Sequence, residues 1–251
     1  MYEQLIEMIR NSNHIVFFGG AGVSTESGIP DFRSETGLWS AKTKYGCSPE
    51  EVVSHEFFMN RMEDFYEFYF ERMIFPNVQP NSTHQVLAEL EKIGKLDAIV
   101  TQNIDGLHQA AGSKIVYELH GSIGRYFCIK CHKQYDLTYA LDLIHRKKDS
   151  FIPHCTCGGA LKPDVVLFNE GLNQQVVTGA TKAIKNADLM IVGGTSLVVY
   201  PAASLLDYFH GKNLVLINKQ STSYDHQANL VFHSGLGDVF TSLNPLLEAK
   251  K

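Results

Sequence analysis

The chain has 251 residues, of which 44% are hydrophobic and 20% are charged. This composition is typical of a globular protein with one large core, or with a large core and a small one. The formal net charge is −5 at pH 7 and the lysines and arginines are scattered, so we expect no nucleic acid and no anionic membrane among its partners.

The first predicted element is an amphipathic helix over 2–11. It carries acidic residues and lacks the basic start and small-residue cleavage site of a signal peptide. No apolar run reaches the roughly 18 to 20 residues that a bilayer-spanning helix needs. We therefore expect a cytoplasmic protein.

Short runs of branched and aromatic residues predict buried parallel strands at 14–20, 97–103, 188–194 and 213–219. Helical patterns lie between them, at 48–74 in one or two pieces, 82–93, 175–186 and 201–210, with Pro201 opening the last. This alternation predicts an α/β fold, with a Rossmann-like parallel sheet covered by helices on both faces. Ligands of such sheets bind beyond the carboxyl ends of the strands.

A glycine-rich turn follows the first predicted strand. Three glycines within 19–22 precede Ser24 and Thr25, so backbone N–H groups and a helix N-terminus can approach a pyrophosphate, as a dinucleotide requires. However, Thr25 stands where the third glycine of a G-x-G-x-x-G motif would fall. Taken alone, the stretch is equally compatible with a structural turn between strand and helix.

The region 124–162 interrupts the alternation, because it is rich in Cys, His, Lys and Tyr and has little continuous apolar sequence. It contains two cysteine pairs separated by 23 residues, namely Cys128 with Cys131 and Cys155 with Cys157. Four thiolates are the ligand set of a closed structural zinc site, and unligated thiols in a loop are the alternative. We predict a Rossmann-like domain formed by 1–123 and 163–251, and a small zinc-ribbon-like module at 124–162.

Three further motifs carry polar side chains suited to a ligand. "SGIPDFRS" (27–34) places charges around an aromatic residue, "TQNIDGLHQAAG" has Asn103 and Asp105 beyond a strand end, and "ELHGS" has His120 beyond another. Singly they also fit a solvated loop, a capped turn or a structural histidine. Together with "CIKC", "CTCGG", "LKPDVVLFNE", "GGTSLVVYPAA" and "INK", they resemble, over nearly the whole chain, the bacterial-type sirtuins, which are NAD-dependent protein lysine deacylases.

The resemblance implies that the larger domain binds NAD. The residues implied around its phosphates and riboses are Ala21, Gly22, Thr25, Gln102, Thr195, Ser196 and Asn218. Phe32 and Arg33 would belong to a mobile loop that closes over the cofactor, and Asp238 and Val239 would lie close to the adenine.

The resemblance also implies the reacting end of the site. Ile104 and Asp105 would hold the nicotinamide amide, which needs a hydrogen-bond acceptor where water is displaced. Asn103 would order the ribose and its water. His120 would act as the general base, because an imidazole titrates near neutral pH and can take a proton from a ribose hydroxyl once the acyl oxygen has attacked the anomeric carbon.

The substrate side of the site is implied by two segments. Residues 161–170 would offer an edge on which a peptide pairs as an added strand, with Val165 and Phe168 near the acyl-lysine tunnel. Sirtuins that remove succinyl or malonyl groups resemble one another in a Tyr-x-x-Arg on the helix at 63–73. Here Tyr66 corresponds to the tyrosine and Tyr69 replaces the arginine, with Arg72 one turn further. We therefore expect uncharged acyl groups to be preferred.

One motif departs from the family pattern. The second cysteine pair of the family is normally C-x-x-C, whereas here it is one residue shorter. His154 and His132 are conceivable substitute ligands, but a C-x-C can reach one metal from a tight turn, so we favour four sulfurs. By resemblance, this zinc would stabilise the module and take no part in the chemistry.

The predicted function is NAD-dependent protein lysine deacetylation, which gives nicotinamide, O-acetyl-ADP-ribose and free lysine. The alternatives are NAD-dependent protein ADP-ribosylation and a non-catalytic NAD-sensing module. The expected cofactors are NAD and zinc, and the expected partners are acyl-lysine peptides or proteins. No pattern sets the oligomeric state, for which a monomer is the expectation.

Overall fold

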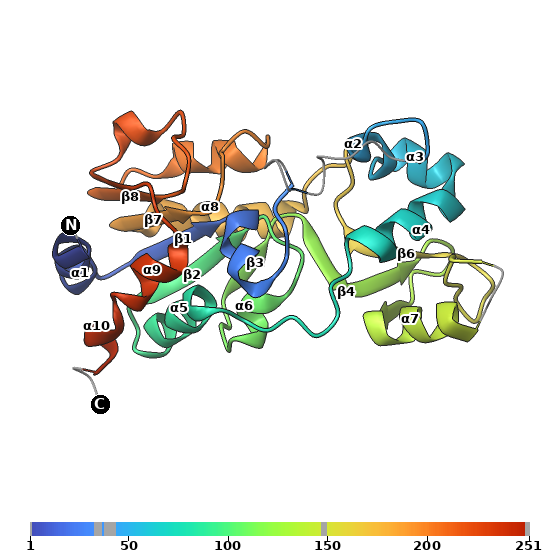
Figure 1. The fold of residues 1–251 in the computed structure, drawn as a ribbon, viewed down its shortest axis with the longest axis horizontal. Coiled ribbons are helices and arrows are strands. Elements are labelled where there is room, and N and C mark those ends of the chain that lie inside the picture. The colour runs from blue at the N-terminus through green and yellow to red at the C-terminus, as the bar shows by residue number, and fades with distance from the viewer. Residues whose placement is uncertain (1, 33–36, 38–43, 147–149, 249–251) are drawn as a thin grey trace.

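The larger sheet of the protein contains six parallel strands. The computed structural model describes residues 2–32, 37, 44–146 and 150–248. The strands are β1 (Ile15–Gly19), β2 (Leu96–Thr101), β3 (Val116–Glu118), β7 (Leu189–Gly193), β8 (Asn213–Ile217) and β9 (Leu230–Phe232), in the spatial order β3-β2-β1-β7-β8-β9 (Figure 1). Counted within this sheet the order is 3-2-1-4-5-6, which reverses direction between β1 and β7.

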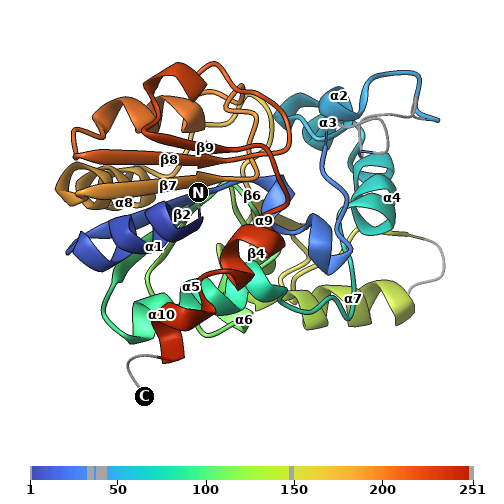
Figure 2. The ribbon, with the colours of Figure 1, turned by 60° about the vertical axis from the view of Figure 1, so that its left-hand side comes forward.

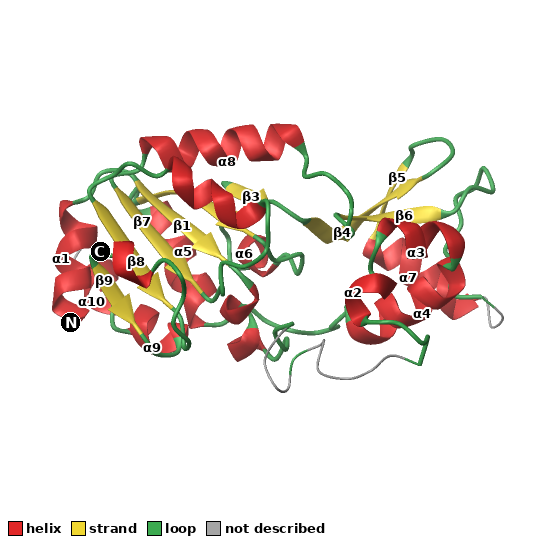
Figure 3. Cartoon of the chain, turned by 90° about the horizontal axis from the view of Figure 1, so that it is seen from above, coloured by secondary structure: helices red, strands yellow, loops and turns green. Residues whose placement is uncertain are grey.

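Helices cover both faces of this sheet (Figure 3), which confirms the predicted fold class. Alternate residues of β1 point to opposite faces, so that Phe17 packs into one core and Phe18 into the other. The first core includes α1 (Tyr2–Asn11), α5 (Ser82–Lys92), α9 (Leu236–Thr241) and α10 (Asn244–Glu248), and Figure 2 shows the last two beside α5. The second core includes α8 (Gln174–Asn186) and the 3₁₀ helix η3 (Ala202–Tyr208).

A second, antiparallel sheet lies beside the first and has the order β5-β4-β6. It is formed by β4 (Gly121–Cys128), β5 (Gln134–Asp136) and β6 (Leu161–Val165). An aromatic-rich core joins it to α7 (Leu137–Arg146), α2 (Pro49–Val52), α3 (His55–Asn60) and α4 (Met62–Arg72) (Figure 1). Residues from well outside 124–162 therefore share a core with the cysteine region.

Two predicted helices differ from the structure. The 48–74 pattern forms three helices rather than one or two. Ser48 and Ser54 cap the first two with their side chains, and the third begins at Met62 without a side-chain cap. The 201–210 pattern forms the 3₁₀ helix η3 rather than an α-helix, and Pro201 precedes it. Among the residues that the structure describes, no helix is both long and apolar enough to cross a membrane.

Arg125 connects the two sheets. Its Nη1 donates to Glu118 Oε2 at 2.8 Å, at the end of β3, and its Nε donates to Asp164 Oδ2 at 2.7 Å, in β6. Between them the chain turns at Gly121, whose φ of 76° lies in the left-handed region and whose missing side chain leaves room for the carbonyl of Asp164. The residue before this turn is His120, which is thereby held at the boundary of the two sheets.

Candidate active site

A cavity of about 810 Å³ lies at the carboxyl ends of the parallel strands, where the strand order reverses. The loops after β1, β2, β7 and β8 line it, and the chain that follows β6 forms the opposite wall. The predicted site residues that it brings together are Ala21, Gly22, Thr25, Phe32, Gln102, Asn103, Ile104, Asp105, His120, Val165, Phe168, Thr195, Ser196 and Asn218.

Three described residues that were predicted to contact NAD or the substrate are not among those lining the cavity. Tyr66 is fully buried in the aromatic core, where its hydroxyl donates to the carbonyl of Leu161. In α9, Asp238 is exposed and Val239 belongs to the core of the larger sheet. Arg33 lies outside the described residues.

The glycine turn packs against the loop after β7. It forms two short 3₁₀ turns, η1 (Ala21–Val23) and η2 (Thr25–Ser27), instead of opening a long helix. A Cβ atom at Gly22 would lie 2.7 Å from the Cα of Gly194, and the Gly22 amide donates to the Gly194 carbonyl at 2.8 Å. Gly20 donates to Gly193 in the same way at 3.1 Å. These glycines therefore let two loops touch, and their amides are used within the protein rather than left for a pyrophosphate.

A buried chain of hydrogen bonds connects the loops after β1 and β2. Asn103 Nδ2 donates to Ser24 Oγ at 3.1 Å, and Ser24 Oγ donates to Asp105 Oδ2 at 2.6 Å. Burial raises the pKa of Asp105, although the bonds from Ser24 and from the amide of Leu107 act to lower it. The contact of Ser24 could not be read from the sequence, since its partner Asp105 is 81 residues away.

The geometry of His120 leaves one ring nitrogen ready to take up a proton. Its Nδ1 lies 2.9 Å from the carbonyl oxygen of Gln102, and a carbonyl can only accept, so Nδ1 carries the hydrogen. The lone pair is therefore on Nε2. Burial lowers the pKa of His120 below its ordinary 6.5, and the bond to Gln102 opposes this shift. The imidazole is neutral at pH 7 and can act as a base.

Gln102 and Thr195 join the ends of β2 and β7. Gln102 Nε2 donates to Thr195 Oγ1 at 3.1 Å, and the same hydroxyl oxygen accepts the amide of Leu197 at 3.2 Å. Thr195 is buried. This bond fixes the side chain of Gln102, and the backbone carbonyl of the same residue orients His120.

Four residues that line the cavity come from α4 and the chain after it, and we call this part of the lining the apolar branch: Tyr69, Met73, Phe75 and Val78. Thus Tyr69, rather than Tyr66, reaches the cavity. Arg72 does not line the branch, and its half-exposed side chain lies 4.0 Å from Glu71. Among the described residues that line the whole cavity, Lys219 is the one lysine or arginine.

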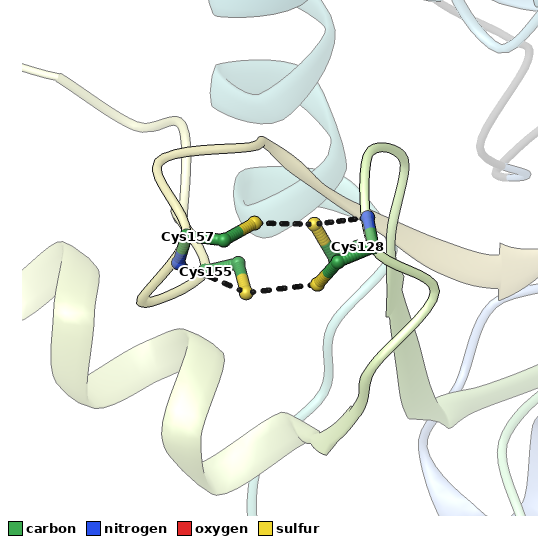
Figure 4. Close-up of side chains that lie close together, drawn as sticks. Cys128, Cys155 and Cys157 are labelled. Atoms are coloured by element: carbon green, nitrogen blue, oxygen red, sulfur yellow. Dashed lines mark hydrogen bonds between the residues drawn. The ribbon is translucent and has the colours of Figure 1, made fainter.

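Four cysteines form a cluster at one end of the smaller sheet. Their sulfur atoms all lie within 4.8 Å of one another, and the pairs Cys128–Cys157 and Cys131–Cys155 are each 3.5 Å apart. Figure 4 shows the sulfurs of Cys128, Cys155 and Cys157 turned toward one another. A disulfide would need about 2.05 Å, whereas tetrahedral Zn–S bonds of about 2.3 Å place sulfurs roughly 3.8 Å apart.

The cluster is therefore positioned to hold a zinc ion with four sulfurs. The amide of Cys157 and the hydroxyl of Tyr135 donate to Cys155 Sγ and lower the pKa of Cys155 to about 6, which favours the thiolate that zinc requires. The shorter C-x-C pair reaches the cluster. Of the two histidines considered as substitutes, neither belongs to it, and His154 Nδ1 donates to the carbonyl of Ile152.

Comparison with known proteins identifies the family. The model described as "Sir2 family" matches residues 20–201. Proteins named NAD-dependent protein deacetylase are 55% identical over 241 residues in Clostridium acetobutylicum, covering 96% of each chain, and 57% identical over 238 residues in Clostridium perfringens, covering 94% of this chain and 95% of the relative. A solved complex of Sir2 with a p53 peptide and NAD⁺ has a TM-score of 0.85 at 37% identity and covers 100% of this chain and 98% of its own. The chain therefore belongs to the Sir2 family.

Proposed function

We propose that the chain is an NAD-dependent protein lysine deacetylase, which converts acetyl-lysine, NAD and one water into free lysine, nicotinamide and O-acetyl-ADP-ribose. The observation that carries this proposal is the neutral His120, which has its lone pair on Nε2 and lines the same cavity as the Asn103–Ser24–Asp105 chain. The names of the bacterial relatives and the NAD⁺ and peptide bound to the Sir2 neighbour support the same activity.

In this proposal, three side chains act on the nicotinamide half of NAD. Asp105 would accept a hydrogen bond from the carboxamide, and Ser24 holds the carboxylate in place by donating to its Oδ2. On bound NAD, the substrate acyl oxygen would bond to the anomeric carbon as the bond to nicotinamide breaks. His120 Nε2 would take the proton from a ribose hydroxyl, so that this oxygen can attack the acyl carbon and water can release the lysine amine. The backbone carbonyl of Gln102 would stabilise the imidazolium that results.

The wall that follows β6 would bind the substrate peptide. It runs from Val165 to Glu170, and both Val165 and Phe168 line the cavity. Among the described residues, the carbonyl of Val166 and the amide of Asn169 have no protein partner, so they can pair with the backbone of an extended peptide. Main-chain pairing of this kind predicts broad peptide selectivity.

The zinc would have a structural role only and would take no part in the reaction. Four protein sulfurs would complete the ligand set of a zinc ion, so no position would be left for water or substrate. We also propose that 124–162 is the inserted module of a larger NAD-binding domain, that the chain acts as a monomer, and that it works in the cytoplasm. Sedimentation equilibrium and cell fractionation test the last two statements.

The function is tested by incubating the purified protein with NAD and an acetyl-lysine peptide and recording mass spectra of peptide and nucleotide products. Deacetylation predicts loss of one acetyl group per nicotinamide released, together with O-acetyl-ADP-ribose. An ADP-ribosyltransferase would instead add ADP-ribose to a protein side chain and leave the acetyl group in place. A sensing module would bind NAD without releasing nicotinamide. Either result would overturn the proposal.

A further inference from the structure

We propose that Glu170 is a positioning residue for the substrate peptide, acting together with Lys162 and His55. This inference rests on the proposed function, because it concerns the wall on which the acyl-lysine peptide would lie. These three side chains, which we call the wall network, set the backbone of 165–168. Their effect is expected on peptide binding, while NAD binding is served by the opposite side of the cavity.

Glu170 lies at the centre of the wall network. Its Oε2 accepts the amide of Leu167 at 3.0 Å and the ammonium of Lys162 at 3.0 Å, while its Oε1 lies 2.8 Å from His55 Nδ1. The Glu170 amide also donates to the Leu167 carbonyl at 3.0 Å. The carboxylate therefore closes a tight turn around Asn169, whose φ of 70° lies in the left-handed region.

Lys162 and His55 each hold a second point on the wall. Lys162 Nζ donates to the carbonyl of Val165 at 3.0 Å, and the backbone amide of His55 donates to the carbonyl of Phe168 at 3.0 Å. Lys162 and His55 thus each bind one backbone carbonyl of the wall directly, and each also binds the carboxylate of Glu170. Positions 165, 167 and 168 are fixed together, which leaves the Val166 carbonyl in a set orientation.

The charges of the network favour this arrangement. The side chains of Lys162 and Glu170 are 23% and 20% exposed, so their attraction is screened less than that of a surface pair. Burial alone would raise the pKa of Glu170, but the bonds from His55 and from the Leu167 amide, with the charge of Lys162, lower it. The carboxylate is ionised at neutral pH and accepts all three hydrogen bonds.

A purely structural role would make a different prediction. If the network only stabilised the fold, removing it would lower the melting temperature and would change the KM values for peptide and for NAD by similar factors. If it positions the wall, the KM for peptide changes and the KM for NAD does not. Glu170→Gln tests this, because it keeps the shape of the side chain and removes the charge that binds Lys162 and His55.

The experiment measures kcat and both KM values for the wild type, Glu170→Gln, Lys162→Met and Lys162→Arg with NAD and an acetyl-lysine peptide. Glu89→Gln is the matched control, because Glu89 forms an exposed pair with Lys92 on α5. We expect the KM for peptide to rise about tenfold in Glu170→Gln and Lys162→Met, the KM for NAD to stay within twofold, and Lys162→Arg and the control to resemble the wild type.

An unchanged KM for peptide in Glu170→Gln, or equal changes in both KM values, would overturn the inference while leaving the proposed function intact. A wild-type protein that does not deacetylate the peptide would instead overturn the proposed function, and the inference with it. Fluorescence anisotropy of a labelled acetyl-lysine peptide gives an independent readout. Its Kd is expected to rise by the same factor in Glu170→Gln.

Discussion

The cavity at the reversal of the large sheet and the four-cysteine cluster of the small sheet are built in opposite ways. At the cavity, the protein alone fully buries the strands β1 and β7. Two loops approach each other there because Gly22 and Gly194 have no side chains. In the cysteine cluster, four thiols meet across a 23-residue gap in a region with little continuous apolar sequence, and two of them, Cys128 and Cys155, belong to the aromatic-rich core. The cavity is placed on a stable fold, whereas the cluster is part of what makes its region fold.

This difference separates the expected effects of mutation. Changes at the cavity should lower turnover or affinity and leave the fold intact, because the strands that carry the site are held by other contacts. Changes at the cluster should unfold the small sheet first and lower activity as a consequence, since metal binding contributes directly to folding free energy.

The largest effect is expected for Cys157→Ser. Structural zinc contributes about 10 to 16 kcal/mol in zinc-finger peptides, so loss of one ligand should release the metal and unfold the module. The zinc content measured by elemental analysis should fall from one ion per chain to none, and limited proteolysis should cleave the chain between residues 128 and 160. Cys47→Ser is the control, because Cys47 lies outside the cluster. A zinc-free, well-folded and active wild type would contradict the structural role of the metal.

His120→Ala should have the next largest effect, with the opposite pattern. A general base contributes about 10² to 10⁴ in rate, so kcat should fall by at least a hundredfold while melting temperature and NAD affinity hold. His210→Ala is the matched control at an exposed histidine. Near-normal turnover in His120→Ala would remove this residue from the role of base.

The pH profile provides a second test of His120. The imidazole must be neutral to accept a proton, and burial lowers its pKa below 6.5. The acidic limb of kcat/KM should therefore lie below pH 6.5, with full activity above it. A limb above this value would require a different titrating group.

The sequence predicted the framework of the cavity better than its connections. The strands β1, β2, β7 and β8 were predicted because each is an apolar run bounded by polar or glycine residues, while β3 and β9 have three residues each and gave no comparable pattern. Asn103, Asp105 and His120 were expected together because the family resemblance assigns all three to one site. Ser24 gave no signal, because its role depends on a partner far away in the chain.

The helix α4 shows where a sequence pattern alone is insufficient. Tyr66 and Tyr69 are three residues apart, both are fully buried, and only the packing of α4 against the small sheet determines which one faces the cavity. The wall network was likewise outside the reach of the sequence pattern, since His55 and Glu170 are 115 residues apart. Contacts of this range follow from the tertiary arrangement rather than from local periodicity.

A smaller effect, on the order of a hundredfold, is expected when the acyl group carries a charge. The apolar branch beside Tyr69 has no lysine or arginine among its described lining residues, and Arg72 lies outside it. A buried carboxylate without a cationic partner costs several kcal/mol, so kcat/KM should fall in this proportion from acetyl- to succinyl-lysine on one peptide. Butyryl-lysine is the control, because it has a similar length and no charge. Equal cleavage of succinyl- and acetyl-lysine would show that the interpretation of Tyr69 is wrong.

The smallest effect is expected for Gly22→Ala, which adds a single methyl group where the two loops meet. The new Cβ would lie 2.7 Å from the Cα of Gly194 and 2.9 Å from its carbonyl oxygen, and backbone atoms cannot move aside as a flexible side chain can. Overpacking of this kind costs about 1 to 3 kcal/mol.

The loops can relieve this contact only by separating, which weakens the 2.8 Å bond from the Gly22 amide to Gly194 and displaces the turn that carries Ser24. Since 1.4 kcal/mol corresponds to a factor of ten, the KM for NAD should rise about tenfold, with little change in the KM for peptide. Gly171→Ala is the matched control, because its Cβ would meet nothing within 4 Å. If both variants kept the wild-type KM for NAD, the close contact at Gly22 would contribute to packing and not to NAD binding.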